Sequence, residues 1–137
     1  VYGPWGRPDM AYYKFVNNII FDKEIKVYGN GKMKRDFTYI DDVIKMLFLL
    51  SKSFKQTKKF DYFNICSNKP IDLMKAINYL IKKKNFKKLK KTILQKADVL
   101  KTHGCNKKIL KITKYKNLTD IYSGFDQTIT WFDKSKY

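Results

Sequence analysis

Arginine is rare in this chain, and one of its two arginines stands where it could bind a phosphorylated ligand. Arg35 lies just before the predicted start of a helix and outside that helix. A guanidinium binds a diphosphate as a two-pronged donor, in a way that the single ammonium of lysine cannot. We therefore expect Arg35 to be a diphosphate-binding residue.

The residues after Arg35 carry the signals of a helix start. Thr38 is followed three residues later by Asp41, which fits a capping box. Asp41 and Asp42 place negative charge at the positive end of the helix dipole. An apolar run then extends to Leu50. The pattern predicts a strand over 35–39 and a helix over about 39–53.

The remaining elements follow from periodicity, turn residues and helix-start signals along the chain. The predicted elements are a helix over about 9–22 capped by Asp9, a strand over 25–28, a turn at 29–31, a strand over 62–66, a helix opened by Pro70, a lysine-rich helix end over 82–91, an edge strand over 92–94, a helix over 106–112 and a final helix capped by Thr119.

Length and composition allow one domain with a modest core. No apolar run approaches the roughly 18–20 residues that span a bilayer, and the N-terminus has no signal-peptide pattern. Cys66 and Cys105 do not make a disulfide framework. These features lead us to expect a cytoplasmic protein without a metal site.

The formal net charge of +18 has two interpretations. All but two of the 30 basic residues are lysines, with a dense patch over 82–91. The patch could bind a polyanion such as nucleic acid, or it could be a solvated face. Nucleic-acid binders usually use arginine forks, and neither arginine lies in the patch. We therefore favour the solvated face over nucleic-acid binding and expect no membrane partner.

Several segments resemble the NAD-dependent epimerases and dehydratases, which are extended short-chain dehydrogenases/reductases. The resemblance is to UDP-glucuronate 4-epimerases in particular and spans nearly the whole chain. It rests on an ordered set of segments: Val1-Tyr2-Gly3-Pro4-Trp5-Gly6-Arg7-Pro8-Asp9-Met10-Ala11, Arg35-Asp36-Phe37-Thr38-Tyr39-Ile40-Asp41-Asp42, Tyr62-Phe63-Asn64-Ile65, Ser67-Asn68-Lys69-Pro70 and Gln95-Lys96-Ala97-Asp98-Val99.

The resemblance implies an α/β fold, the C-terminal portion of a Rossmann-type extended short-chain dehydrogenase. Residues 1–36 and 67–137 would form most of a substrate-binding subdomain. Residues 37–66 would supply the last helix and strand of a truncated Rossmann sheet. The chain would then be a single partial unit.

The resemblance also implies ligand contacts in the first half of the chain. Arg7 would meet a uronic carboxylate, although it could instead pair with Asp9. Val27 and Tyr28 would lie against the uracil ring, although they could serve only strand packing. Pro4 is the expected cofactor contact.

A second group of expected contacts lies near residue 95. Gln95 and Asp98 resemble the family's substrate clamp, in which the acid accepts hydrogen bonds from two ribose hydroxyls. The chain has Lys96-Ala97 where Pro-Gly is commoner, which weakens the prediction of the turn. The alternative for Asp98 is a helix cap.

The implied reaction is NAD-dependent inversion at C4 of a UDP-sugar, in which the cofactor performs the redox chemistry. The family's Gly-rich NAD turn does not occur in these 137 residues. Tyr79 and Lys83 satisfy Tyr-x-x-x-Lys by spacing alone, in a setting that indicates chance. We therefore expect no catalytic residue here and no turnover by the chain alone. His103, the only histidine, is expected to be an exposed polar residue.

The sequence is compatible with other functions as well. The chain could come from a related nucleotide-sugar dehydratase or reductase, or act as a basic polyanion-binding module. Expected partners are a UDP-sugar and either a separate N-terminal half or a second copy in a homodimer. The chain could also be the relic of a broken gene.

Overall fold

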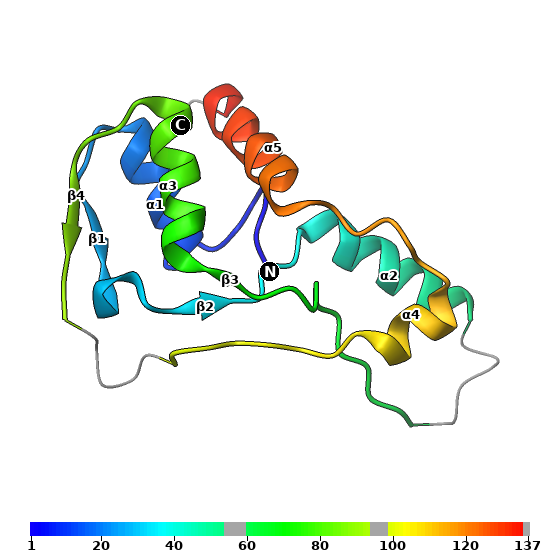
Figure 1. Cartoon of the computed structure of the whole chain (residues 1–137). Helices are drawn as coiled ribbons and strands as arrows, with labels where there is room; N and C mark the ends of the chain where they lie inside the picture. The colour runs from blue at the N-terminus through cyan, green and yellow to red at the C-terminus, as the bar shows by residue number, and fades with distance from the viewer. Residues whose placement is uncertain (54–59, 94–98, 136–137) are drawn as a thin grey trace.

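The computed structural model describes residues 1–53, 60–93 and 99–135. Helices α1, α3 and α5 lie together in one part of the molecule, whereas α2 and α4 pack against each other in another (Figure 1). In chain order the elements are α1 (Ala11–Ile20), β1 (Ile25–Val27), the 3₁₀ helix η1 (Tyr28–Gly31), β2 (Lys34–Arg35), α2 (Ile40–Lys52), β3 (Ile71–Asp72), α3 (Leu73–Lys84), β4 (Leu89–Lys91), α4 (Lys107–Thr113) and α5 (Ile121–Lys134).

The strands form two short pairs. β1 runs parallel to β4, with Ile25 opposite Leu89. β2 runs antiparallel to β3, with Lys34 opposite Asp72. Lys34 also bridges Lys101 in a parallel sense, so the chain around residue 101 lies beside β2. These pairings place β3 and the chain around residue 101 beside β2, although both are distant from it in sequence.

The core is an aromatic cluster between α1, α5 and the N-terminal segment. The rings of Tyr12 and Phe125 stack with centroids 4.6 Å apart, and Tyr2 meets Tyr12 edge-on at 5.1 Å. Both arrangements suit the quadrupoles of aromatic rings. The apolar residues that recur every three or four positions in the first helix predict a buried stripe, and the structure confirms it: Tyr12, Phe15, Val16 and Ile19 are buried and Ile20 is partly buried.

Both predicted caps in the first half of the chain are wrong. The first residue of α1 follows Met10, which provides no side-chain cap, and the carboxylate of Asp9 pairs with Arg7. Helix α2 begins one residue later than the capping box requires, with Tyr39 in the cap position. The Thr38 hydroxyl instead accepts a hydrogen bond from the backbone N–H of Ser67 at 3.1 Å. A long-range contact therefore replaces the local one.

The region after residue 69 also differs from the prediction. Pro70 does not open the helix, because β3 comes first and α3 begins at Leu73. Lysines 82–84 form the last turn of α3, where the dipole favours positive charge. The edge strand is β4 and lies three residues before the predicted position, although the N–H of Thr92 still donates to the carbonyl of Val27 at 2.8 Å.

The final helix is capped by Asp120, which accepts hydrogen bonds from the N–H groups of Tyr122 and Ser123. The predicted cap, Thr119, has another role. Its N–H and hydroxyl donate to the carboxylate of Asp42, at 2.8 and 3.0 Å. Asp42 is buried and thus ties the start of α2 to the segment before α5.

Helix α2 confirms the predicted span to within one residue at each end, but much of its apolar run faces solvent. Ile44, Leu47 and Phe48 share one exposed face, whereas Met46 is fully buried. The predicted strand over 62–66 is not a strand in the described chain, because it has no ladder partner there. None of the helices in the described ranges has the length and apolarity that a bilayer span needs.

Candidate nucleotide-binding site

A cavity of about 870 Å³ opens between α1, β1 and β2. This volume lies within the range of small-molecule sites. Its wall mixes apolar and aromatic side chains with charged and polar ones. Tyr28, Arg35 and Thr102 are the lining residues that bear on the predicted contacts.

Arg35 lies at the end of β2 and lines this cavity. Its guanidinium donates to the carbonyl of Lys34 at 3.0 Å and contacts the sulfur of Met33 at 3.2 Å. A guanidinium has five N–H donors in a fixed fork. Since only these two contacts engage it within the described residues, donors remain for a ligand.

Asp36 holds the loops beside Arg35 in place. One carboxylate oxygen accepts hydrogen bonds from the N–H groups of Asn68 and Gly104, both at 3.1 Å. The other accepts a hydrogen bond from the hydroxyl of Ser67. The carboxylate therefore joins two loops that are far apart in sequence, and its negative charge is largely satisfied by fixed donors.

The segment that follows the predicted clamp lies directly against Arg35. The N–H of Lys34 donates to the carbonyl of Leu100 at 2.8 Å, and the N–H of Thr102 donates to the carbonyl of Lys34 at 3.1 Å. Thr102 also lines the cavity. Gln95 and Asp98 themselves lie outside the described residues, so their contact with ribose stays a prediction.

The two residues predicted beside the base differ in position. Tyr28 is half-buried and lines the cavity. Val27 is fully buried in the core, and its carbonyl accepts the N–H of Thr92. Val27 is the last residue of β1, whereas Tyr28 is the first residue of the 3₁₀ helix η1. Of the two side chains, only that of Tyr28 therefore faces the cavity.

Arg7 and Pro4 belong to the loop before α1 and are absent from the cavity wall. The Arg7 guanidinium makes a bidentate pair with Asp9, with both N···O distances at 3.0 Å. Both partners are well exposed, so the pair is weak and can open. Pro4 is half-buried in a turn.

Tyr79 and Lys83 share one partner on α5. The Tyr79 hydroxyl and the Lys83 ammonium donate to the two carboxylate oxygens of Asp126, at 2.7 and 2.8 Å. The hydrogen bond to Asp126 raises the pKa of Tyr79. A raised pKa keeps the tyrosine hydroxyl protonated at neutral pH and so unavailable as a base, which supports the interpretation of the Tyr-x-x-x-Lys spacing as chance.

His103 is exposed, as predicted, and one ring nitrogen lies 2.7 Å from the side-chain oxygen of Asn68. Cys66 is half-buried, Cys105 is exposed, and both are free thiols. The described ranges contain no group of three or more His, Cys, Asp or Glu side chains that could hold a metal ion.

Asp36 and Gly104 are the site residues that the sequence did not reveal. Asp36 follows Arg35 directly and belongs to the same segment of the family resemblance, and these two signals could have pointed to it. No local signal marks Gly104. A Cβ there would lie 2.6 Å from the sulfur of Cys66, so the close approach of the two loops requires glycine.

Comparison with known proteins agrees with the predicted family. Residues 1–66 match the model of the NAD dependent epimerase/dehydratase family. The chain is 43% identical over 139 residues to an uncharacterized protein of Methanocaldococcus jannaschii, in a match that covers 99% of this chain and 41% of that protein. It is 34% identical over 151 residues to UDP-glucuronate 4-epimerase 2 of Arabidopsis thaliana, covering 96% and 34% of the two chains.

The fold resembles that of UDP-glucuronic acid 4-epimerase from Bacillus cereus, solved in complex with UDP-glucuronic acid and NAD. The TM-score is 0.79 at 26% identity, over 98% of this chain and 43% of that one. The fold is thus that of the Rossmann-type extended short-chain dehydrogenases/reductases. Together these matches confirm the predicted family relationship: the chain is related to the NAD-dependent epimerases/dehydratases. It spans less than half the length of these relatives.

Proposed function

We propose that the chain is the nucleotide-sugar-binding portion of an NAD-dependent UDP-sugar 4-epimerase of the UDP-glucuronate type. The observation that carries this proposal is the shared cavity of Tyr28, Arg35 and Thr102. Arg35 would bind the diphosphate, and Tyr28 would lie against the uracil. Asp98, four residues before Thr102, would bind the ribose hydroxyls together with Gln95.

Firm binding of the nucleotide suits an epimerase. The sugar must turn between the two hydride transfers, so the enzyme has to hold the remote part of the substrate instead. Binding energy from that remote part positions the reacting carbon. Arg35 is fixed by the carbonyl of Lys34 and the sulfur of Met33, which prepares its remaining donors before the ligand arrives.

Arg7 is the proposed contact for the uronic carboxylate. Its pair with Asp9 is exposed and bidentate, and a carboxylate of the ligand could replace the carboxylate of Asp9 with the same fork geometry. Met10, three residues further, lines the cavity. The loop of Arg7 therefore adjoins the site.

NAD is the cofactor of the proposed reaction and would supply the hydride chemistry. The residues present do not fit it on their own, because the Gly-rich turn that cradles the dinucleotide phosphates is not among them. Pro4, in the loop before α1, remains the proposed cofactor contact. The chain would therefore bind the nucleotide sugar without turning it over by itself.

Titration calorimetry of the chain with UDP tests this proposal. We expect saturable binding that the conservative variant Arg35→Lys weakens about tenfold, because lysine lacks the fork. Arg7→Lys is the matched control, which should leave UDP affinity within about twofold because UDP has no carboxylate. Absence of saturable UDP binding would overturn the assignment.

Two further measurements distinguish the alternatives. Arg7→Gln should lower affinity for UDP-glucuronate relative to UDP-glucose. The isolated chain should give no product from UDP-glucuronate and NAD⁺, whereas turnover would contradict the proposed lack of catalysis. A polyanion-binding module would instead bind mixed-sequence DNA more tightly than UDP, with a steep salt dependence.

A further inference from the structure

The cavity wall that contains Tyr28 also contains a polar side chain from strand β1. Burial along β1 alternates, with Ile25 and Val27 fully buried and Lys26 exposed. Strand β1 ends at Val27, and Tyr28 is the first residue of the 3₁₀ helix η1. Lys26 and Tyr28 both line the cavity, so this wall combines an ammonium group with an aromatic ring.

The Lys26 ammonium makes no hydrogen bond or ion pair to any residue within 1–53, 60–93 or 99–135. Other lysines near β1 and β4 are paired, for example Lys88 with Asp22 and Lys84 with Asp133. An ammonium has three donors and no acceptor. A cavity wall with unused donors beside an aromatic ring suits a ligand that has a flat ring and a carbonyl at its edge.

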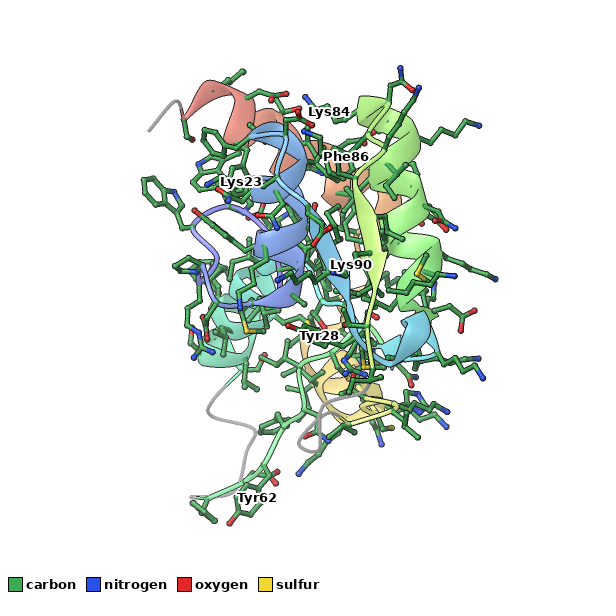
Figure 2. The ribbon with its side chains drawn as sticks, turned by 90° about the vertical axis from the view of Figure 1, so that its left-hand side faces the viewer. Lys23, Tyr28, Tyr62, Lys84, Phe86 and Lys90 are labelled. Carbon is green, nitrogen blue, oxygen red and sulfur yellow. The ribbon has the colours of Figure 1, made fainter. Side chains whose placement is uncertain are left out.

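The pairing of β1 with β4 places a second lysine opposite Lys26, which destabilises the strand pair. Lys26 lies directly opposite Lys90, and like charges on opposed strand positions destabilise a pair. Figure 2 shows β1 and β4 side by side, with Tyr28 and Lys90 labelled. Lys90 is not part of the cavity wall. Lys26 and Lys90 therefore differ in access to the cavity while carrying the same charge.

We infer that Lys26 is a base-specificity residue that donates a hydrogen bond to the O4 carbonyl of uracil while Tyr28 lies against the ring. This inference rests on the proposed function. Position 4 of cytosine has an amino group, which is a donor, where uracil has an acceptor. A lysine donor at that edge favours uridine and opposes cytidine nucleotides, since two donors facing each other leave both unpaired.

The test compares UDP with CDP by calorimetry, because the two ligands carry the same charge. Any attraction from the net charge of +18 cancels in the ratio of their affinities. We expect the wild-type chain to prefer UDP about tenfold and Lys26→Met to reduce that preference to about twofold or less. Lys26→Arg, which restores a donor, should recover most of the preference.

Lys90→Met is the matched control, because it removes one positive charge from the same strand pair outside the cavity. It should leave the ratio of UDP to CDP affinity unchanged. Equal binding of UDP and CDP by the wild type, or an unchanged ratio in Lys26→Met, would overturn the role of Lys26 alone. A wild-type chain that does not bind UDP would overturn both this role and the proposed function.

Discussion

The carboxylate of Asp36 accepts a hydrogen bond from the backbone N–H of Gly104 at 3.1 Å, across 68 positions of sequence. The same carboxylate binds the N–H of Asn68 and the hydroxyl of Ser67. Arg35 lies one residue before Asp36 and lines the cavity. Arg35, the proposed diphosphate-binding residue, is therefore held next to a carboxylate that joins two distant loops by hydrogen bonds.

Replacement of Asp36 by Asn should destabilise the fold. The amide keeps one acceptor but turns an NH₂ group toward backbone N–H donors, so one charged acceptor is lost and one donor is left facing another. We expect the free energy of unfolding to fall by roughly 2–3 kcal/mol, measured by urea denaturation. Asp9→Asn is the control, because its exposed pair with Arg7 contributes at most about 1 kcal/mol. Equal losses in the two variants would contradict the role of Asp36.

Two adjacent acidic residues at the start of α2, Asp41 and Asp42, should contribute very different amounts to the stability of the fold. Asp42 is buried and accepts hydrogen bonds from the Tyr115 hydroxyl at 2.7 Å and from both donors of Thr119, whereas Asp41 is exposed. Asp42→Ala leaves those donors without partners and should cost roughly 3–4 kcal/mol. Asp41→Ala loses only a dipole interaction of about 0.3–1 kcal/mol.

The comparison uses urea denaturation of both variants at one pH. Burial and the bond to Asp42 also raise the pKa of Tyr115 to about 12. We expect Tyr115 to remain protonated through the neutral range and to keep donating to Asp42. Similar losses in the two alanine variants would show that Asp42 acts as a simple first-turn charge.

At Gly124 in α5, helix propensity alone predicts that replacement by alanine stabilises the fold, and we expect the opposite. Alanine is favoured over glycine by about 1 kcal/mol in a helix interior. A Cβ at Gly124, however, would lie 2.0 Å from the hydroxyl oxygen of Tyr2 and 2.8 Å from its Cζ. We expect Gly124→Ala to destabilise the fold by roughly 1–3 kcal/mol through overpacking.

A double-mutant cycle with Tyr2→Phe tests this explanation. Removing the hydroxyl deletes the atom nearest to the added methyl group, so the double variant should lose less stability than the two single variants combined. The relief should be partial, because the ring carbon stays close. Strict additivity would mean that Tyr2 is not the obstacle to alanine at Gly124.

The sequence predicted elements with strong periodicity well and local caps poorly. The span of α2 and the buried stripe of α1 follow from apolar residues repeated every three or four positions. The expected caps at Thr38 and Thr119 failed because both residues bind partners distant in sequence, Ser67 and Asp42. A local pattern contains no information about such long-range competitors.

The site was predictable to a similar degree. Arg35 stood out because arginine is rare and its fork suits phosphates, and the structure does bring it to the cavity. Val27 and Tyr28 could not be separated without knowing where β1 ends, because Val27 is its last, buried residue and Tyr28 opens η1 at the cavity. The role of Asp36 required knowledge of which loops meet, and no spacing in the sequence supplies that knowledge.

The last prediction concerns pH and the contact between α3 and α5. Hydrogen bonds from Lys83 and Tyr79 lower the pKa of Asp126 although its partial burial acts in the opposite direction. A carboxyl group whose folded pKa is lowered contributes stability above its unfolded pKa of about 4. That contribution disappears as the pH falls through the lower folded value.

We therefore expect the wild-type chain to lose more stability between pH 6 and pH 3 than Asp126→Asn, measured by urea denaturation at both pH values. Lys83→Met should reduce the difference as well, because it removes the cation that contributes most to lowering the pKa of Asp126. The effect should be small, since the pair is partly exposed and screened by salt. Parallel pH profiles for the wild type and Asp126→Asn would show that this cluster does not stabilise the helix contact through the charge of Asp126.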